Sequence, residues 1–182
     1  MAISMYRSRS WKRSSCDAIG VRVSSAARIG VGDVAPEFSV NGTDGTKSGH
    51  RLYGLAEFRG RPLVLAFYPA DNSPVCTVQL AAYTRGADEF AAVGAQVLGL
   101  SPQSVESHDA FAAAHAGFAF PLLADIGKLV GARYGILGPL GFYRRSIFVI
   151  DSAGVVRYAH RSVTSMGYQP IDVIVEEVRR LG

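Results

Sequence analysis

Two apolar runs with a helical segment between them limit the possible folds of this chain more than any other feature. Pro62–Tyr68 and Gln96–Ser101 carry no charged side chain and show no regular polar alternation. Such runs are typical of strands covered on both faces, as in a parallel sheet. Between them, Ser73-Pro74 predicts a helix start, with Ser73 as N-cap and Pro74 at the first helical position. Together the three elements predict a right-handed βαβ unit.

The helix after Pro74 is predicted to run for about five turns. Its inward apolar residues would be Val75, Val78, Ala82, Phe90 and Val93. Further helices are predicted over Ser104–His115, Gly127–Tyr134 and Ile171–Leu181. Turn dipeptides stand at Asn41-Gly42 and Asp44-Gly45.

The second half of the chain predicts a hairpin. Arg145–Ile150 and Val155–His160 flank the turn Asp151–Gly154 and should pair as antiparallel strands. Gly135–Gly141 is predicted to be a loop, because Pro139 and three glycines discourage both helix and strand, and it could form part of a substrate rim. The expected fold class is therefore α/β: a thioredoxin-like fold with a central mixed sheet flanked by helices.

The charge is concentrated at the N-terminal end. Residues 1–28 hold six basic side chains and one acid, which gives +5, and the other 154 residues hold 13 basic and 14 acidic side chains, which gives −1. We expect residues 1–30 to be a disordered basic, Ser-rich tail and residues 31–182 to form one domain. A nearly neutral domain argues against nucleic-acid binding. No apolar run approaches the roughly 20 residues that span a bilayer, so no membrane partner is expected.

The two cysteines, Cys16 and Cys76, cannot form a disulfide framework or a four-ligand zinc site by themselves. The four histidines show no metal-ligand spacing, and the fingerprint-like string Gly30–Ala35 has no buried strand before it. No metal or cofactor is therefore expected. The composition predicts a cytoplasmic protein, and the Arg- and Ser-rich tail keeps import into an organelle as the alternative.

Cys76 lies two residues after Pro74, in the first turn of the predicted helix. Free backbone N–H groups and the positive end of the helix dipole favour a thiolate at such a position. A small buried hydrophobic residue is the other common role of a free cysteine. Position alone leaves both readings open.

The string around Cys76 resembles the active-site motif of the peroxiredoxins, which runs Pro, three residues, Thr or Ser, two residues, Cys. The spacing matches from Pro69 through Ser73 to Cys76. Arg145 stands where that family has an arginine at the start of a later strand. The resemblance covers about residues 31–182 and is closest to the Q-type, or bacterioferritin-comigratory, branch.

The resemblance implies a thiol-dependent peroxidase for hydrogen peroxide and organic hydroperoxides. Cys76 would attack the peroxide and become a sulfenic acid. Arg145 would stabilise the thiolate and hold a peroxide oxygen. Ser73 would donate a hydrogen bond to the peroxide or the sulfur, and Pro69 would shield the sulfur from water. A homodimer is also compatible with the family.

The chain departs from the Q-type pattern at three positions. Many members carry a resolving cysteine five residues after the first, where this chain has Ala81. Cys16 is then the remaining candidate for resolution, and the main expectation is a one-cysteine mechanism with a low-molecular-weight thiol or a thioredoxin-like protein as reductant. Ser73 replaces a more usual threonine, and Gln79 stands where glutamate is common.

Two other functions fit the same fold. A thiol–disulfide oxidoreductase would need Cys-x-x-Cys, but Ser73 and Gln79 occupy the positions three before and three after Cys76. A non-enzymatic redox sensor, in which oxidation of Cys76 alters an interaction, stays open as an alternative or added role.

Overall fold

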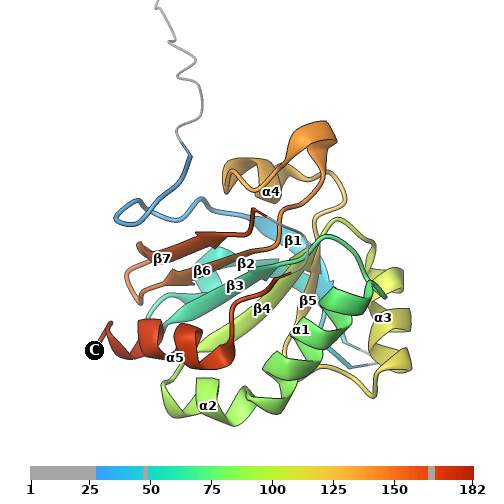
Figure 1. The fold of residues 1–182 in the computed structure, drawn as a ribbon, viewed down its shortest axis with the longest axis horizontal. Coiled ribbons are helices and arrows are strands. Elements are labelled where there is room, and N and C mark those ends of the chain that lie inside the picture. Colours follow the sequence, from blue (N-terminus) through green and yellow to red (C-terminus); the bar gives the residue numbers. More distant parts are fainter. Residues whose placement is uncertain (1–27, 47–48, 164–166) are drawn as a thin grey trace, which may run out of the picture.

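The structure, a computed structural model, describes residues 28–46, 49–163 and 167–182. Within these residues a seven-stranded mixed sheet has the order β2-β1-β5-β4-β3-β6-β7. Its strands are β1 (Ser39–Thr43), β2 (His50–Gly54), β3 (Leu63–Phe67), β4 (Gln96–Ser101), β5 (Leu122–Ala124), β6 (Ser146–Ile150) and β7 (Val156–Arg161). Strands β3, β4 and β5 are parallel neighbours, and β6 joins β3 antiparallel. The predicted βαβ unit and C-terminal hairpin are both present (Figure 1).

Helices cover both faces of the sheet (Figure 1). They are α1 (Pro74–Arg85), α2 (Ala87–Ala92), α3 (Val105–Ala114), α4 (Leu129–Arg133) and α5 (Ile171–Arg179), with 3-10 helices η1 (Leu55–Phe58) and η2 (Pro139–Gly141). One face packs against α1, α2, α3 and α5, and the other against η1 and α4. The α/β, thioredoxin-like arrangement is thus as the sequence predicts.

Strand β3 supplies residues to both cores. Leu63, Leu65 and Phe67 point into the core beside η1 and α4, whereas Val64 and Ala66 point into the core beneath α1. This alternation follows from the two-residue period of a strand. It explains why the run is apolar at every position, because neither of its faces meets water.

The helix predicted after Pro74 differs from the structure in two ways. It breaks at Gly86, which ends α1 and precedes α2, and a side chain at 86 would meet Ile171 of α5. The predicted inward face is confirmed only in part, because Ala82 and Phe90 are buried as expected. Val78 is 53% exposed, while Cys76 and Gln79 are buried. A polar residue, Gln79, belongs to the inward face, and apolar periodicity alone does not find it.

The prediction of a turn at Asn41-Gly42 is wrong. Both residues lie inside β1, opposite Leu52 and Arg51 of β2. Gly42 has a packing role there, because an added Cβ would lie 2.5 Å from the Leu123 side chain. The next dipeptide, Asp44-Gly45, does lie between β1 and β2, and Gly45 has a φ of 89°, which glycine adopts at little cost. Apart from residues 28–30, the predicted tail lies outside the described residues.

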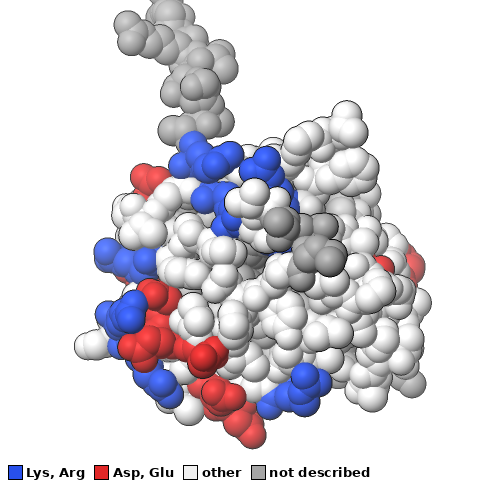
Figure 2. Space-filling view, viewed as in Figure 1, with Lys and Arg blue, Asp and Glu red and all other residues white. Residues whose placement is uncertain are grey.

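The charges on the viewed face are mixed. Figure 2 shows acidic and basic side chains side by side around α5, where Arg180 pairs with Glu176 and Glu177. Basic side chains gather near the place where the described chain begins (Figure 2). In the part of the chain that the structure describes, no helix is long and apolar enough to cross a membrane.

Close packing at Gly42 gives a test of the sheet. We expect Gly42→Ala to lower the free energy of unfolding by about 1–3 kcal/mol, because the new methyl group meets Leu123 in a packed layer. The control is Gly127→Ala, where the atom nearest to an added Cβ is Cγ of Leu129, 3.7 Å away. Urea unfolding of both variants measures the difference, and equal losses would contradict the packing role of Gly42.

Candidate functional site

Cys76 lies in the first turn of α1, just beyond the carboxyl end of β3, and it is fully buried. The first hydrogen bond of the helix runs from the Thr77 N–H to the Ser73 carbonyl oxygen. Pro74 has no N–H, and the N–H groups of the first helical turn have no acceptor within the helix. They leave a concentration of partial positive charge near Cys76, which favours negative charge on the sulfur.

Arg145 contacts the sulfur directly. Its Nη1 and Nη2 atoms each lie 3.5 Å from Sγ of Cys76. The sheet explains the meeting, because β6 is the antiparallel neighbour of β3 and Ser146 pairs with Phe67 at the end of β3. Arg145 precedes β6 by one residue and is only 3% exposed. A buried guanidinium in contact with sulfur stabilises a thiolate strongly, since little water screens the two charges.

Gln79 orients Arg145, a role that the sequence analysis missed. Nη1 of Arg145 donates to Oε1 of Gln79, and Nε2 of Gln79 lies 3.4 Å from the Tyr83 hydroxyl. The Tyr83 hydroxyl in turn donates to the Gln169 carbonyl oxygen. Burial raises the pKa of Tyr83, so this hydroxyl keeps its proton. The available signal was the spacing, because Gln79 lies one helical turn after Cys76.

The other two predicted residues lie on the segment between β3 and α1. Ser73 is the N-cap residue of α1 and Pro74 begins the helix, as predicted, although the Ser73 hydroxyl makes no capping hydrogen bond. Pro69 lies on the wall of a hollow that Arg145 also lines. The structure thus brings Cys76 and Arg145 into contact and places Pro69 beside the arginine. Cys16 lies outside the described residues.

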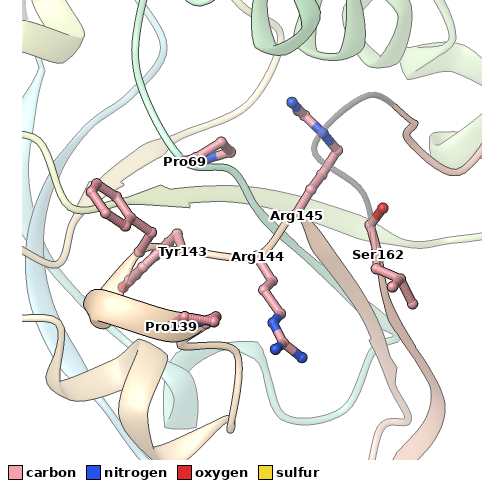
Figure 3. Close-up of a pocket in the computed structure, with 9 residues that line it drawn as sticks. Pro69, Pro139, Tyr143, Arg144, Arg145 and Ser162 are labelled. Carbon is pink, nitrogen blue, oxygen red and sulfur yellow. The ribbon is translucent and has the colours of Figure 1, made fainter.

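A hollow of about 520 Å³ opens beside Arg145 (Figure 3). Its walls are Pro69, Gly138, Pro139, Phe142, Tyr143, Arg144, Arg145, Ser162 and Val163. In Figure 3 the Arg145 side chain extends on the side of Pro69, whereas Arg144 extends the other way, toward Pro139. The loop predicted as a possible substrate rim therefore contributes Gly138 and Pro139. The hollow is much larger than a hydrogen peroxide molecule and has several apolar walls.

The described part of the chain holds no group of three or more His, Cys, Asp or Glu side chains that could bind a metal ion. Its chemistry-bearing groups are instead one free, buried thiol and the guanidinium in contact with it. A single thiol at the start of a helix, on a thioredoxin-like sheet, defines the class of site.

The comparisons with known proteins agree with this class. The AhpC/TSA family model matches residues 31–159, and the chain belongs to this family, that of the peroxiredoxins. Chloroplastic peroxiredoxin Q of Sedum lineare is 34% identical over 157 residues, which are 85% of this chain and 79% of that protein. Peroxiredoxin 2 of Thermoplasma acidophilum is 34% identical over 157 residues, covering 83% and 75%.

Other relatives are longer. Chloroplastic peroxiredoxin Q of Triticum aestivum is 34% identical over 137 residues, 74% of this chain, and the match spans 60% of the wheat protein. Among solved structures, Mycobacterium tuberculosis AhpC superposes with a TM-score of 0.78 at 24% identity, covering 85% of this chain and 94% of that one. The reduced 2-Cys peroxiredoxin of Plasmodium vivax gives 0.76 at 26% identity, covering 82% and 80%.

The contact between Gln79 and Arg145 gives a prediction about stability. We expect Gln79→Leu to lower the free energy of unfolding by about 1–3 kcal/mol, because it takes an acceptor from a buried guanidinium. Gln79→Glu keeps an acceptor and should cost less. Val78→Leu, at the exposed neighbouring position, is the control. Denaturant unfolding that shows no loss in Gln79→Leu would refute the orienting role.

Proposed function

We propose that this chain is a thiol-dependent peroxidase that reduces hydrogen peroxide and organic hydroperoxides, with Cys76 as the reacting group. One observation carries the proposal: both Nη atoms of Arg145 lie 3.5 Å from Sγ of Cys76, beside an open hollow. Membership of the AhpC/TSA family supports the same chemistry. The match spans 60% of the length of the wheat relative and 60% of the rice relative.

In the first half-reaction the Cys76 thiolate attacks one peroxide oxygen. The S–O bond forms, the O–O bond breaks, and the leaving hydroxide or alkoxide takes up a proton to become water or an alcohol. Cys76 is thereby oxidised to a sulfenic acid. Enzymes commonly accelerate reactions by about a million-fold or more, which is far beyond the gain from ionising one thiol. Most of the acceleration must come from orienting the peroxide and stabilising the charge that moves onto oxygen.

Three residues are assigned to that task. Arg145 would hold the peroxide oxygen while it stabilises the thiolate, since a guanidinium carries several donors in a fixed plane. Ser73, whose hydroxyl is not used for capping, would donate a hydrogen bond to the peroxide or the sulfur. Pro69, on the wall of the hollow, would keep water from the sulfur. Apolar walls at Pro139 and Phe142 would suit the carbon skeleton of an organic hydroperoxide.

In the second half-reaction an external thiol reduces the sulfenic acid. The first thiol displaces water and forms a mixed disulfide with Cys76, and a second thiol releases Cys76 and leaves as part of a disulfide. We propose a low-molecular-weight thiol or a thioredoxin-like protein as the reductant. Cys16 is the alternative resolving residue, and the homodimer remains a proposal from the family resemblance.

The cellular location is proposed from composition. We keep the cytoplasm as the expected location and organelle import through the N-terminal segment as the alternative. The wheat, rice and Sedum relatives are named chloroplastic, which supports the alternative. Fractionation of cells expressing the full chain distinguishes the two.

The alternatives differ from a peroxidase in catalytic turnover. A thiol–disulfide oxidoreductase lacks its second active-site thiol here, because Ser73 and Gln79 flank Cys76 at the positions where one would stand. A redox sensor would be oxidised once and would not consume excess peroxide. Consumption of hydrogen peroxide and cumene hydroperoxide with a panel of thiol reductants therefore tests the function.

Substitution of the guanidinium gives a sharp prediction. We expect Arg145→Lys to slow the oxidation of Cys76 by about tenfold or more, because lysine keeps the charge but loses the planar set of donors. Stopped-flow oxidation under excess peroxide measures the rate constant. Arg180→Lys, at the exposed end of α5 and outside the walls of the hollow, is the control. An unchanged rate in Arg145→Lys would remove Arg145 from the mechanism.

The one-cysteine mechanism predicts which oxidised species forms. After one equivalent of peroxide, mass spectrometry should find a sulfenic acid on Cys76 and no disulfide between residues 16 and 76. Cys76→Ser should abolish peroxide consumption, and Cys16→Ser should leave it intact. A disulfide as the main product would instead assign resolution to Cys16.

A further inference from the structure

A second cluster of buried polar groups lies beneath the segment that carries Pro69 and Ser73. Its centre is Asp71, whose side chain is 3% exposed. This carboxylate accepts a hydrogen bond from the Ser107 hydroxyl at 2.6 Å and from the Tyr68 hydroxyl at 2.9 Å. Nδ1 of His108 lies 2.9 Å from one Asp71 oxygen and 3.2 Å from the other. The reaction described above uses none of these four side chains.

The cluster ties the segment to two separate elements. Tyr68 directly follows β3, whereas Ser107 and His108 belong to the first turns of α3. In the sheet, β4, which leads into α3, is on one side of β3, and β6, which follows Arg145, is on the other. Figure 1 accordingly shows α3 at the side of the molecule away from β6 and β7. The segment 69–73 is therefore anchored from the side opposite the arginine.

The contacts with Asp71 and Tyr68 are the polar contacts that His108 makes among the described residues. His108 is fully buried, and its Nε2 atom has no hydrogen-bond partner among the described residues. All of its polar contacts are made through Nδ1, which lies near Asp71 and 3.4 Å from the Tyr68 hydroxyl. A buried carboxylate is stable only when donors surround it, and a Nδ1–H group is such a donor.

The Tyr68 hydroxyl acts as a hydrogen-bond donor to Asp71. Burial and the nearby Asp71 charge raise the pKa of Tyr68 well above its ordinary value, so the hydroxyl keeps its proton. Asn72, the residue after Asp71, has a φ of 56°, a left-handed conformation that asparagine tolerates better than most residues. A sharp turn held by a buried carboxylate gives residues 69–73 one well-defined path to the start of α1.

We propose that Asp71 is a positioning residue, and that its contact with Nδ1 of His108 fixes residues 69–73 beside Cys76. The proposal rests on the peroxidase function and adds a requirement to it. Pro69 and Ser73 can act on the peroxide only if this segment is held in place, and displacement by about 1 Å is enough to slow a reaction greatly. The His108 side chain thus controls the oxidation rate without touching sulfur or peroxide.

Three substitutions at one position test the contact. Asparagine places an amide N–H near the location of Nδ1, glutamine places it one methylene further out, and leucine has no donor. In the full chain we expect His108→Leu and His108→Gln to lower the rate constant for oxidation of Cys76 by hydrogen peroxide about tenfold, and His108→Asn to stay within about threefold of the unaltered chain. His115→Leu, at the exposed end of the same helix, is the matched control and should leave the rate unchanged.

Rescue by asparagine separates positioning from general loss of stability, because folding is followed in the same samples by thermal unfolding. A His108→Leu protein that oxidises at the normal rate would overturn the proposal, and so would a folded His108→Asn protein as slow as His108→Leu. If His108→Leu does not fold, Ser107→Ala removes another donor from Asp71, and we expect a loss of about threefold. A normal rate in Ser107→Ala would then overturn the proposal.

The same assay distinguishes failure of the positioning role from failure of the function. If the unaltered chain consumes peroxide, Cys76→Ser does not, and the position-108 variants do not differ, only the positioning role is wrong. If the unaltered chain does not consume peroxide, the function is wrong and the positioning proposal is rejected with it.

Discussion

The contact between a buried guanidinium and a buried sulfur is the interaction around which the rest of the structure is arranged. Arg145 and Cys76 are both buried from solvent, and an isolated charge at a buried position costs free energy. The guanidinium lies against the sulfur through both Nη atoms, and Gln79 adds a neutral acceptor for the arginine. Because Gln79 carries no charge, the positive charge of Arg145 is not shared with a competing carboxylate at that contact.

This arrangement is possible because three segments meet at the carboxyl end of β3. The strand leads into the segment with Pro69 and Ser73, its antiparallel neighbour β6 begins just after Arg145, and its parallel neighbour β4 leads toward α3. A strand in the middle of a sheet is therefore a suitable support, since its position is fixed by hydrogen bonds on both edges and by packing on both faces. Residues far apart in the sequence reach one place without a long unsupported loop.

Much of the fold could be predicted, because strand β4 and the hairpin follow directly from apolar runs and turn residues. The inward face of the helix after Pro74 could be predicted only in part, since a buried Gln79 and an exposed Val78 contradict apolar periodicity. The same limit applies to Asn41-Gly42, whose turn preference is overridden by close packing against Leu123. At Gln79 and at Asn41-Gly42 the tertiary contacts decide the conformation, and these contacts cannot be read from the local sequence.

For the site, the spacing from Pro69 to Cys76 and the family resemblance were enough to select Cys76 and Arg145 together. They did not show what orients the arginine or what lies under residues 69–73. Asp71 and His108 are 37 positions apart, and the sequence around each residue does not predict their contact. Only the packing of α3 beside the end of β3 reveals it.

Complete enclosure of the sulfur has a consequence for the order of events in a catalytic cycle. A peroxide is small enough to approach through a narrow space, whereas a reducing protein must bring a whole thiol-bearing loop to the same atom. Because Cys76 is fully buried, a small peroxide can reach the sulfur more easily than a reducing protein can. Under the proposed function, enclosure would therefore favour reduction by a small thiol over reduction by a protein unless the start of α1 moves, so the lifetime of the sulfenic acid would depend on the fold as well as on the reductant.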